Sequence, residues 1–117
     1  LFIQNKILTG NYYHITKTIN IDSCLKLGLL ADFSQGFTKI SKRRLNGYIW
    51  LTDQPLLLAN KQLTDIDNWS VIYLKTQVLR LYYSDNNLPV AYLNEFISLN
   101  AHIPKTDIIS VNLLSSL

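Results

Sequence analysis

Two side chains in this 117-residue chain have types and positions suited to chemistry, an early histidine and a late glutamate. His14 lies in the run YYHIT, where residues two apart face the same side of a strand, so Tyr12, His14 and Thr16 form one polar stripe. This imidazole could be a hydrogen-bonded core residue, a metal ligand, a base or a donor to a substrate. Glu95 is the single glutamate beside seven aspartates. Its carboxylate is either surface decoration or a group placed for a purpose.

Arginine and aromatic residues supply further candidates. Arg43 and Arg44 lie in a polar stretch, and guanidinium groups suit diphosphate oxygens because two parallel charge-assisted bonds match their geometry. A solvated basic cluster is an equally good interpretation of this pair. In the run YIWLTD, Tyr48, Trp50 and Thr52 share one strand face. The Trp50 ring could stack on a heteroaromatic ligand or fill the core.

No pattern typical of a metal site or a phosphate-binding loop occurs in the sequence. The one cysteine and two histidines lie too far apart for zinc-like spacing, and the four glycines stand alone. Cys24 cannot form an internal disulfide and is predicted to be a buried structural thiol. A hydrolase with paired carboxylates would need a second acid near Glu95, and the sequence nominates none.

The composition predicts one domain over residues 1–117. With 48% hydrophobic and 16% charged residues, the chain can bury a core and fold. The net charge of +3 suits an anionic partner such as a nucleotide or nucleic acid, although many proteins that bind neither carry a similar charge. No apolar run approaches the ~20 residues of a membrane span, and no leader opens the chain. We therefore expect a soluble, cytoplasmic protein without membrane contact, and the sequence does not predict its oligomeric state.

Strand formers, caps and turn residues alternate along the chain and predict short elements. Strands outnumber helices, which indicates an α+β domain with a dominant sheet. The predicted elements are a strand over 12–16, a helix from the Asn20 N-cap to Gly28, a loop over 30–46, a strand over 47–53, a helix over 54–60 with Asp53 as N-cap, two strand-like runs in 69–85 separated near 75–77, a turn at 85–89 and a closing strand in 102–114.

The order of these motifs resembles the NAD-dependent ADP-ribosyltransferase superfamily. It runs from YHIT through a helix ending in LGLL, an arginine loop and an IWLTD strand to a late glutamate and an IP..DI strand. The opening is similar to DNA-targeting toxins of the DarT type, which begin with a Tyr-His-Ile-Thr strand and a helix running to Gly-Leu. The IWLTD strand is similar to the Ile-Tyr-Leu-Thr-Asp strand of RNA 2′-phosphotransferases. The resemblance covers residues 12–114 through short motifs.

The resemblance implies a split-sheet, ADP-ribosyltransferase-like α+β fold with short helices after the first and second strands, and NAD as substrate. His14 matches the histidine that holds the nicotinamide ribose, and Trp50 stands where many members have a stacking tyrosine. Glu95 matches the late catalytic glutamate. The set expected to bind the cofactor is His14, Thr16, Arg43, Arg44, Tyr48, Trp50 and Thr52, with one of the two neighbouring arginines on the phosphates.

The expected activity is cleavage of the nicotinamide–ribose bond of NAD and transfer of ADP-ribose to a macromolecular acceptor, nucleic acid or protein, without a metal. DNA-targeting members are longer than this chain, which leaves the acceptor open. One alternative is an RNA 2′-phosphotransferase-like enzyme, for which three arginines are few. Another is a non-catalytic interaction or inhibitor module, favoured by the short chain and by Trp50 in place of tyrosine. Small transferases include toxins, phage counter-defence proteins and RNA-processing enzymes, and the sequence does not rank these roles.

Overall fold

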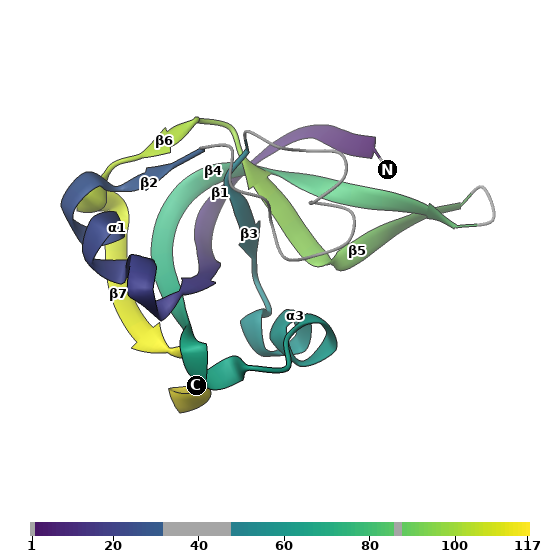
Figure 1. Ribbon diagram of the computed structural model, residues 1–117. Coiled ribbons are helices and arrows are strands. Elements are labelled where there is room, and N and C mark those ends of the chain that lie inside the picture. The colour runs from purple at the N-terminus through teal and green to yellow at the C-terminus, as the bar shows by residue number, and fades with distance from the viewer. Residues whose placement is uncertain (1, 32–47, 86–87) are drawn as a thin grey trace.

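Strands dominate the computed structural model, which describes residues 2–31, 48–85 and 88–117 (Figure 1). Two short α-helices and several 3₁₀ turns connect the strands. The predicted α+β class is confirmed at this level, as a mostly antiparallel sheet with few short helices. The elements are β1 (Phe2–Lys17), α1 (Ile21–Leu27), β2 (Leu29–Leu30), β3 (Trp50–Thr52), α3 (Pro55–Gln62), β4 (Trp69–Asp85), β5 (Leu88–Ser98), β6 (His102–Ile103) and β7 (Ile108–Leu113).

The main sheet has the strand order β1-β3-β5-β4-β7, and β1 also pairs with β4 along most of its length. The pairings among β1, β3, β5 and β4 therefore close into a ring, and β7 extends this ring from the first half of β4. The ring closes between β1 and β3 through one pair, Tyr13 with Thr52. A closed sheet leaves fewer strand edges without partners. The strands β2 and β6 form a separate small sheet.

The helix α1 begins and ends where the sequence predicts. Asn20 is the residue before the helix, but its side chain donates to the Thr16 hydroxyl at 3.4 Å and does not cap the helix. Gly28 ends the helix at φ 80°, a backbone conformation that favours glycine. A Cβ at this position would collide with the carbonyl oxygen of Ile103. Glycine therefore allows β6 to approach the end of α1.

Several predicted boundaries are wrong. The second helix begins at Pro55 with Gln54, not Asp53, as its N-cap, because proline suits the first helical position. The strand β4 runs without interruption through residues 75–77, because these residues pair with 9–11 of β1. The predicted closing strand divides into β6 and β7, and β1 begins well before residue 12. Of the predicted loop, Leu30 belongs to β2, and 32–46 lies outside the described residues.

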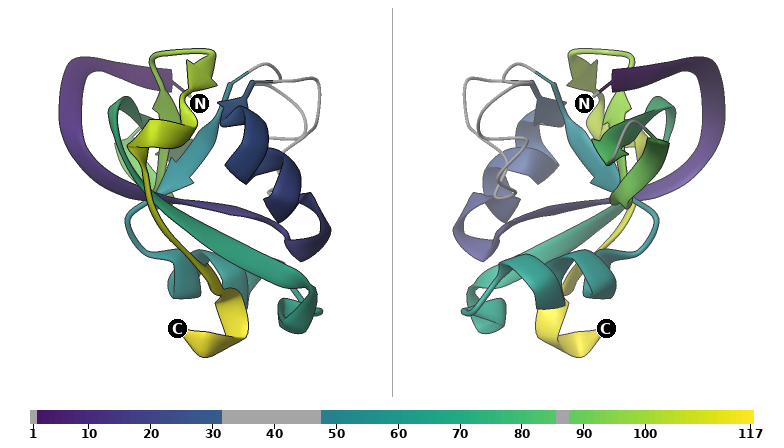
Figure 2. Two further views of the ribbon diagram at one scale, coloured as in Figure 1. Left: turned by 90° about the vertical axis from the view of Figure 1, so that its left-hand side faces the viewer. Right: turned by 90° about the vertical axis from the view of Figure 1, so that its right-hand side faces the viewer.

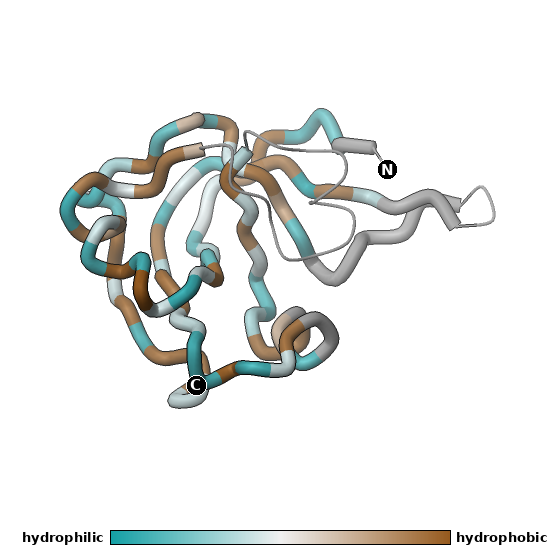
Figure 3. Tube along the Cα trace, in the orientation of Figure 1, coloured by the Kyte–Doolittle hydropathy of each residue, from teal (hydrophilic) through white to brown (hydrophobic). Residues whose placement is uncertain are grey.

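Two groups of buried side chains occupy opposite faces of the sheet. The smaller group joins Ala59 of α3 to Ile15, Val71 and Leu114. Figures 1 and 2 show α3 at the end of the molecule where the C-terminus lies, and Figure 3 shows apolar stretches alternating with polar ones along the strands. The larger group comprises Tyr12, Leu29, Ile49, Leu51, Ile72, Leu74, Val78, Phe96 and Ile103.

Cys24 of α1 packs against the larger group, but it is half-buried, so the prediction of a buried thiol is only partly correct. Among the residues that the structure describes, no helix has the length and apolar character needed to cross a bilayer.

Candidate functional site

A row of polar-tipped side chains crosses the sheet at the point where the ring closes. On one side of this point Ser110 pairs with Tyr73, and Tyr73 pairs with Tyr13. On the other side Tyr13 pairs with Thr52, and Thr52 pairs with Glu95. Residues directly opposite each other on antiparallel strands point to the same side of the sheet. We call the side that holds Tyr13, Tyr73, Thr52 and Glu95 the Glu95 face.

Glu95 is a buried acid at the end of this row. Its side chain is 2% exposed, and its Oε2 atom has no hydrogen-bond partner among the residues that the structure describes. Burial raises the pKa of the Glu95 carboxyl from 4.5 to about 8. The carboxyl is therefore protonated at neutral pH when no ligand is present. A surface location for this residue is excluded, and the group is held where an unpaired polar atom costs about 1–3 kcal/mol.

Thr52, the cross-strand neighbour of Glu95, is 1% exposed. Its Oγ1 accepts a hydrogen bond of 3.0 Å from the backbone N–H of Gln54. A hydroxyl that accepts one bond still carries its own proton, so Thr52 can donate to an acceptor on the Glu95 face. The bond to Gln54 also fixes the turn between β3 and α3.

Tyr13 and Tyr73 continue the row as a pair of half-buried rings. Their centroids lie 4.7 Å apart with the planes tilted by 37°, a favourable aromatic arrangement. The exposed Ser110 lies beyond them. The pair therefore supplies flat apolar surface and two phenol groups between the buried carboxyl and the outer edge of the sheet. Sequence reasoning did not single out Tyr13 or Tyr73, because their place beside Thr52 depends on strand register.

His14 and Trp50 meet at the seam between β1 and β3. The Nδ1 atom of His14 lies 2.7 Å from the backbone carbonyl oxygen of Trp50, so this nitrogen carries a proton and donates it to the carbonyl. Since His14 follows Tyr13, alternation places its side chain on the face opposite Glu95. Trp50 lies two residues before Thr52 and so belongs to the Glu95 face, half-buried. The structure thus brings Trp50, Thr52 and Glu95 to one face, while His14 lies on the opposite face and contacts the backbone of Trp50 at the seam.

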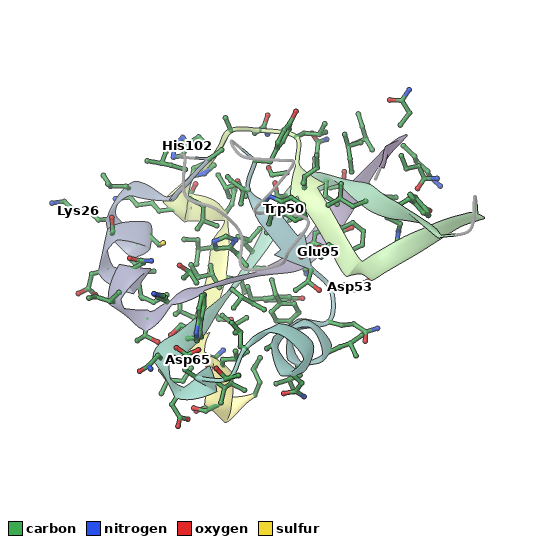
Figure 4. All side chains as sticks on the ribbon, turned by 45° about the vertical axis from the view of Figure 1, so that its right-hand side comes forward. Lys26, Trp50, Asp53, Asp65, Glu95 and His102 are labelled. Carbon is green, nitrogen blue, oxygen red and sulfur yellow. The ribbon has the colours of Figure 1, made fainter. Side chains whose placement is uncertain are left out.

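The remaining predicted site residues lie farther from Glu95 along their strands or outside the described residues. Thr16 is half-buried near the end of β1, and Tyr48, at 44% exposure, precedes β3. Arg43 and Arg44 lie outside the described residues. Figure 4 shows Trp50, Asp53 and Glu95 around β3, with Lys26 and His102 at the α1 end; the register confirms the proximity of β3 and β5.

Burial, register and exposure define what this arrangement can do. A desolvated carboxyl interacts strongly with any positive charge brought next to it, because little water screens the pair. No family model, curated protein or solved structure matches this chain. Within 2–31, 48–85 and 88–117, no three His, Cys, Asp or Glu side chains gather in a way that could hold a metal ion.

Proposed function

We propose that the chain is an NAD-dependent ADP-ribosyltransferase in which Glu95 is the catalytic carboxylate. The observation that carries the proposal is the buried Glu95 carboxyl, in register with Thr52 and Tyr13, with an oxygen that no described residue pairs. A buried acid without a partner is costly to fold and is typical of a site that awaits a ligand. NAD fits this site because its reacting carbon becomes positively charged during bond cleavage.

The reaction proceeds by departure of nicotinamide and attack of an acceptor on the ribose. Nicotinamide leaves as a neutral molecule with the electron pair of the C1′–N bond, and C1′ acquires oxocarbenium-like charge. The ionised Glu95 carboxylate stabilises this charge more in the transition state than in the ground state. An acceptor oxygen or nitrogen then bonds to C1′ and passes its proton to Glu95. The acceptor is a nucleic acid or a protein.

Glu95 has to lose its proton before it can stabilise positive charge. Its pKa of about 8 belongs to the unliganded protein. The nicotinamide ring of NAD is cationic, and a nearby cation lowers the pKa of a carboxyl. We therefore expect kcat/KM, which reports the free protein, to rise with pH and level off above about 8. The rise in kcat, which reports the NAD complex, should occur at lower pH.

The aromatic residues near Glu95 position the cofactor in this proposal. Trp50 lies on the Glu95 face, where its ring can stack on nicotinamide as the family resemblance implies. Thr52, the cross-strand neighbour of Glu95, has a hydroxyl proton that it can donate to the ionised carboxylate. His14 holds the Trp50 carbonyl and so keeps β1 and β3 together at the site.

Nicotinamide release from NAD tests the proposal directly. Wild-type protein incubated with NAD should release nicotinamide with water as a slow acceptor, and Glu95→Gln should lower the rate by at least about 100-fold. Asp67→Asn removes an exposed carboxylate and should leave the rate unchanged. Cooperative thermal unfolding of both variants confirms that they fold.

Two outcomes would contradict the proposal. One is a Glu95→Gln variant that releases nicotinamide at the wild-type rate. The other is a wild-type protein that releases none and whose melting temperature does not change with NAD, which would indicate a non-catalytic module. If nicotinamide is released, the acceptor is identified by intact-mass analysis of candidate nucleic acids and proteins for an added ADP-ribose.

A further inference from the structure

Arg80 lies in β4 at a position where both neighbouring strands are irregular. The pairing of β1 with β4 changes register between Ile3 and Ile7. The pairing of β5 with β4 changes register between Arg80 and Tyr82. The extra residues of β1 therefore lie opposite Arg80, and those of β5 lie opposite the next residue, Leu81. Such bulges redirect side chains and are enriched next to functional sites.

The guanidinium group of Arg80 is held in place by an aromatic ring. It lies 4.6 Å from the ring centroid of Phe96, its direct cross-strand neighbour. Phe96 is 1% exposed and contacts the Tyr12 ring on the same face at 4.8 Å. A cation over a ring face is attracted by the ring quadrupole, so this contact restrains the guanidinium next to Phe96. Arg80 is therefore held beside Phe96 before any ligand binds.

No described residue forms a hydrogen bond or an ion pair with the Arg80 guanidinium. The group is half-buried and has five N–H donors to satisfy. A partly desolvated cation without acceptors is unfavourable unless an anion or water completes it. The fork geometry of the guanidinium favours a ligand with two adjacent oxygen atoms.

The surroundings of Arg80 combine a phenol, a second cation and one acid. Burial raises the pKa of the Tyr12 phenol, the Asp53 carboxylate raises it further, and the Arg80 guanidinium lowers it. Arg80 and Tyr12 share one neighbour on this face, because the guanidinium lies 4.6 Å and the Tyr12 ring 4.8 Å from the centroid of the Phe96 ring. Asp53 is exposed, so solvent screens its charge. Lys6 is also exposed and lies in the irregular segment of β1 opposite Arg80, which leaves the position net positive.

We infer that Arg80 and Tyr12 form a binding site for a phosphate ester. The guanidinium binds two phosphate oxygens, and the phenol donates a third hydrogen bond. Phe96 follows Glu95 on β5, so this site lies on the face opposite the Glu95 carboxyl, which we call the Phe96 face. The site goes beyond the proposed transferase activity and stands whether or not the chain cleaves NAD.

Calorimetric titration with ribose 5-phosphate, inorganic phosphate and ribose tests the site. Ribose 5-phosphate should bind and ribose should not. If inorganic phosphate binds as tightly as ribose 5-phosphate, the site is supported and its ligand is the free phosphate anion. Ribose binding as tightly as ribose 5-phosphate would overturn the inference, as would the absence of binding by either phosphate compound.

Variants locate the binding on the protein. Arg80→Gln should weaken phosphate binding by about tenfold or more, and Arg80→Lys should fall between it and the wild type because lysine keeps the charge but not the fork. Tyr12→Phe keeps the ring contact with Phe96 and should weaken phosphate binding a few-fold. This variant tests the site if Arg80→Gln does not fold. Lys75→Gln, on an exposed position of the same strand, should bind within about twofold of the wild type. Unchanged binding by Arg80→Lys, Arg80→Gln and Tyr12→Phe would overturn the assignment.

The Glu95→Gln variant separates this inference from the proposed function. It should bind ribose 5-phosphate as the wild type does, since the two groups lie on opposite faces. A protein that binds phosphate through Arg80 but releases no nicotinamide would retain the inference and refute the transferase. Loss of phosphate binding in a folded Glu95→Gln variant would instead overturn the separate site.

Discussion

The two faces of one sheet bury very different side chains. On the Phe96 face, Leu51 of β3 and Phe96 of β5 are paired and apolar, and the Tyr12 ring contacts Phe96. At the adjacent position of each strand, the Glu95 face carries Tyr13, Thr52 and Glu95. The first arrangement stabilises the fold by removing apolar surface from water, and the second opposes folding by burying a carboxyl. The difference teaches that a small sheet can hold a costly group because apolar side chains on the other face, and Ile15 and Val71 on its own, stabilise the same strands.

The largest expected effect is the pH dependence that the Glu95 carboxyl gives to the free energy of unfolding. Glu95 loses its proton near pH 4.5 in the unfolded chain and near pH 8 in the folded protein. Between these values only the folded state keeps the proton, so the free energy of unfolding should fall as pH rises, by up to about 5 kcal/mol in total. Below pH 4.5 this contribution is fully present. Glu95→Gln should remove this dependence, so that the variant matches the wild type near pH 5 and exceeds it at pH 8.

Urea denaturation of both proteins between pH 5 and 8 measures this effect. Other titrating groups are common to the two proteins and cancel in the difference. Parallel stability profiles would show that Glu95 ionises normally, and the contrast between the faces would then disappear.

Truncation on the Phe96 face should give the next largest effect. Phe96→Ala removes a ring that is 1% exposed and leaves a cavity, which should lower the free energy of unfolding by about 3–5 kcal/mol. Tyr48→Ala, at a position 44% exposed, should change it by less than about 1 kcal/mol. Chemical denaturation at pH 5, where Glu95 is neutral, measures both. Equal losses would mean that the Phe96 face does not carry the core.

A smaller effect is expected for the hydroxyl beside Glu95. Thr52→Val keeps the side-chain volume but removes the acceptor for the Gln54 N–H, which should cost about 1–3 kcal/mol. Hydrogen exchange at the Gln54 amide should accelerate at the same time. The exposed Thr106→Val serves as a control and should leave both measurements nearly unchanged. Protection of Gln54 that persists in Thr52→Val would remove Thr52 from its role in the turn.

The smallest predicted effect on stability concerns His14, at the seam between β1 and β3. His14→Ala deletes the bond of 2.7 Å to the Trp50 carbonyl and should lower stability by about 1 kcal/mol. His102→Ala deletes a bond of 3.1 Å from an exposed ring to the Leu27 carbonyl and should cost less. Thermal unfolding of the two variants compares them. A greater loss for His102→Ala would contradict the role of His14 at the ring closure.

Local signals in the sequence predicted the elements that depend on local chemistry. Helix α1 lies between Asn20 and Gly28 as the sequence predicts, although only Gly28 acts as a cap, and the β-branched and aromatic runs lie in strands. The continuity of β4 at 75–77 was not predictable, because polar residues there stay in the strand through pairing with β1. The sheet of β2 and β6 has two residues in each strand, too few for a periodic pattern.

The site was predictable in part, since strand alternation placed Trp50 and Thr52 on one face and composition marked the glutamate. Glu95 was identified because it is the one glutamate of the chain, and its burial agrees with a placed group. Tyr13 and Tyr73 were missed because register decides which residues flank Thr52. Arg80 was missed because the irregularities beside it come from strands distant in sequence.

The long pairing of β1 with β4 also affects how fast the chain folds. The partners are 52 residues apart at one end, where Lys17 meets Trp69, and 80 apart at the other, where Phe2 meets Tyr82. Contacts between such distant segments require closure of large loops before they contribute energy, so we expect folding in milliseconds to seconds rather than microseconds. Helix α1 lies within one loop and can form early. The surroundings of Glu95 assemble late, after β1 and β5 have both reached β3.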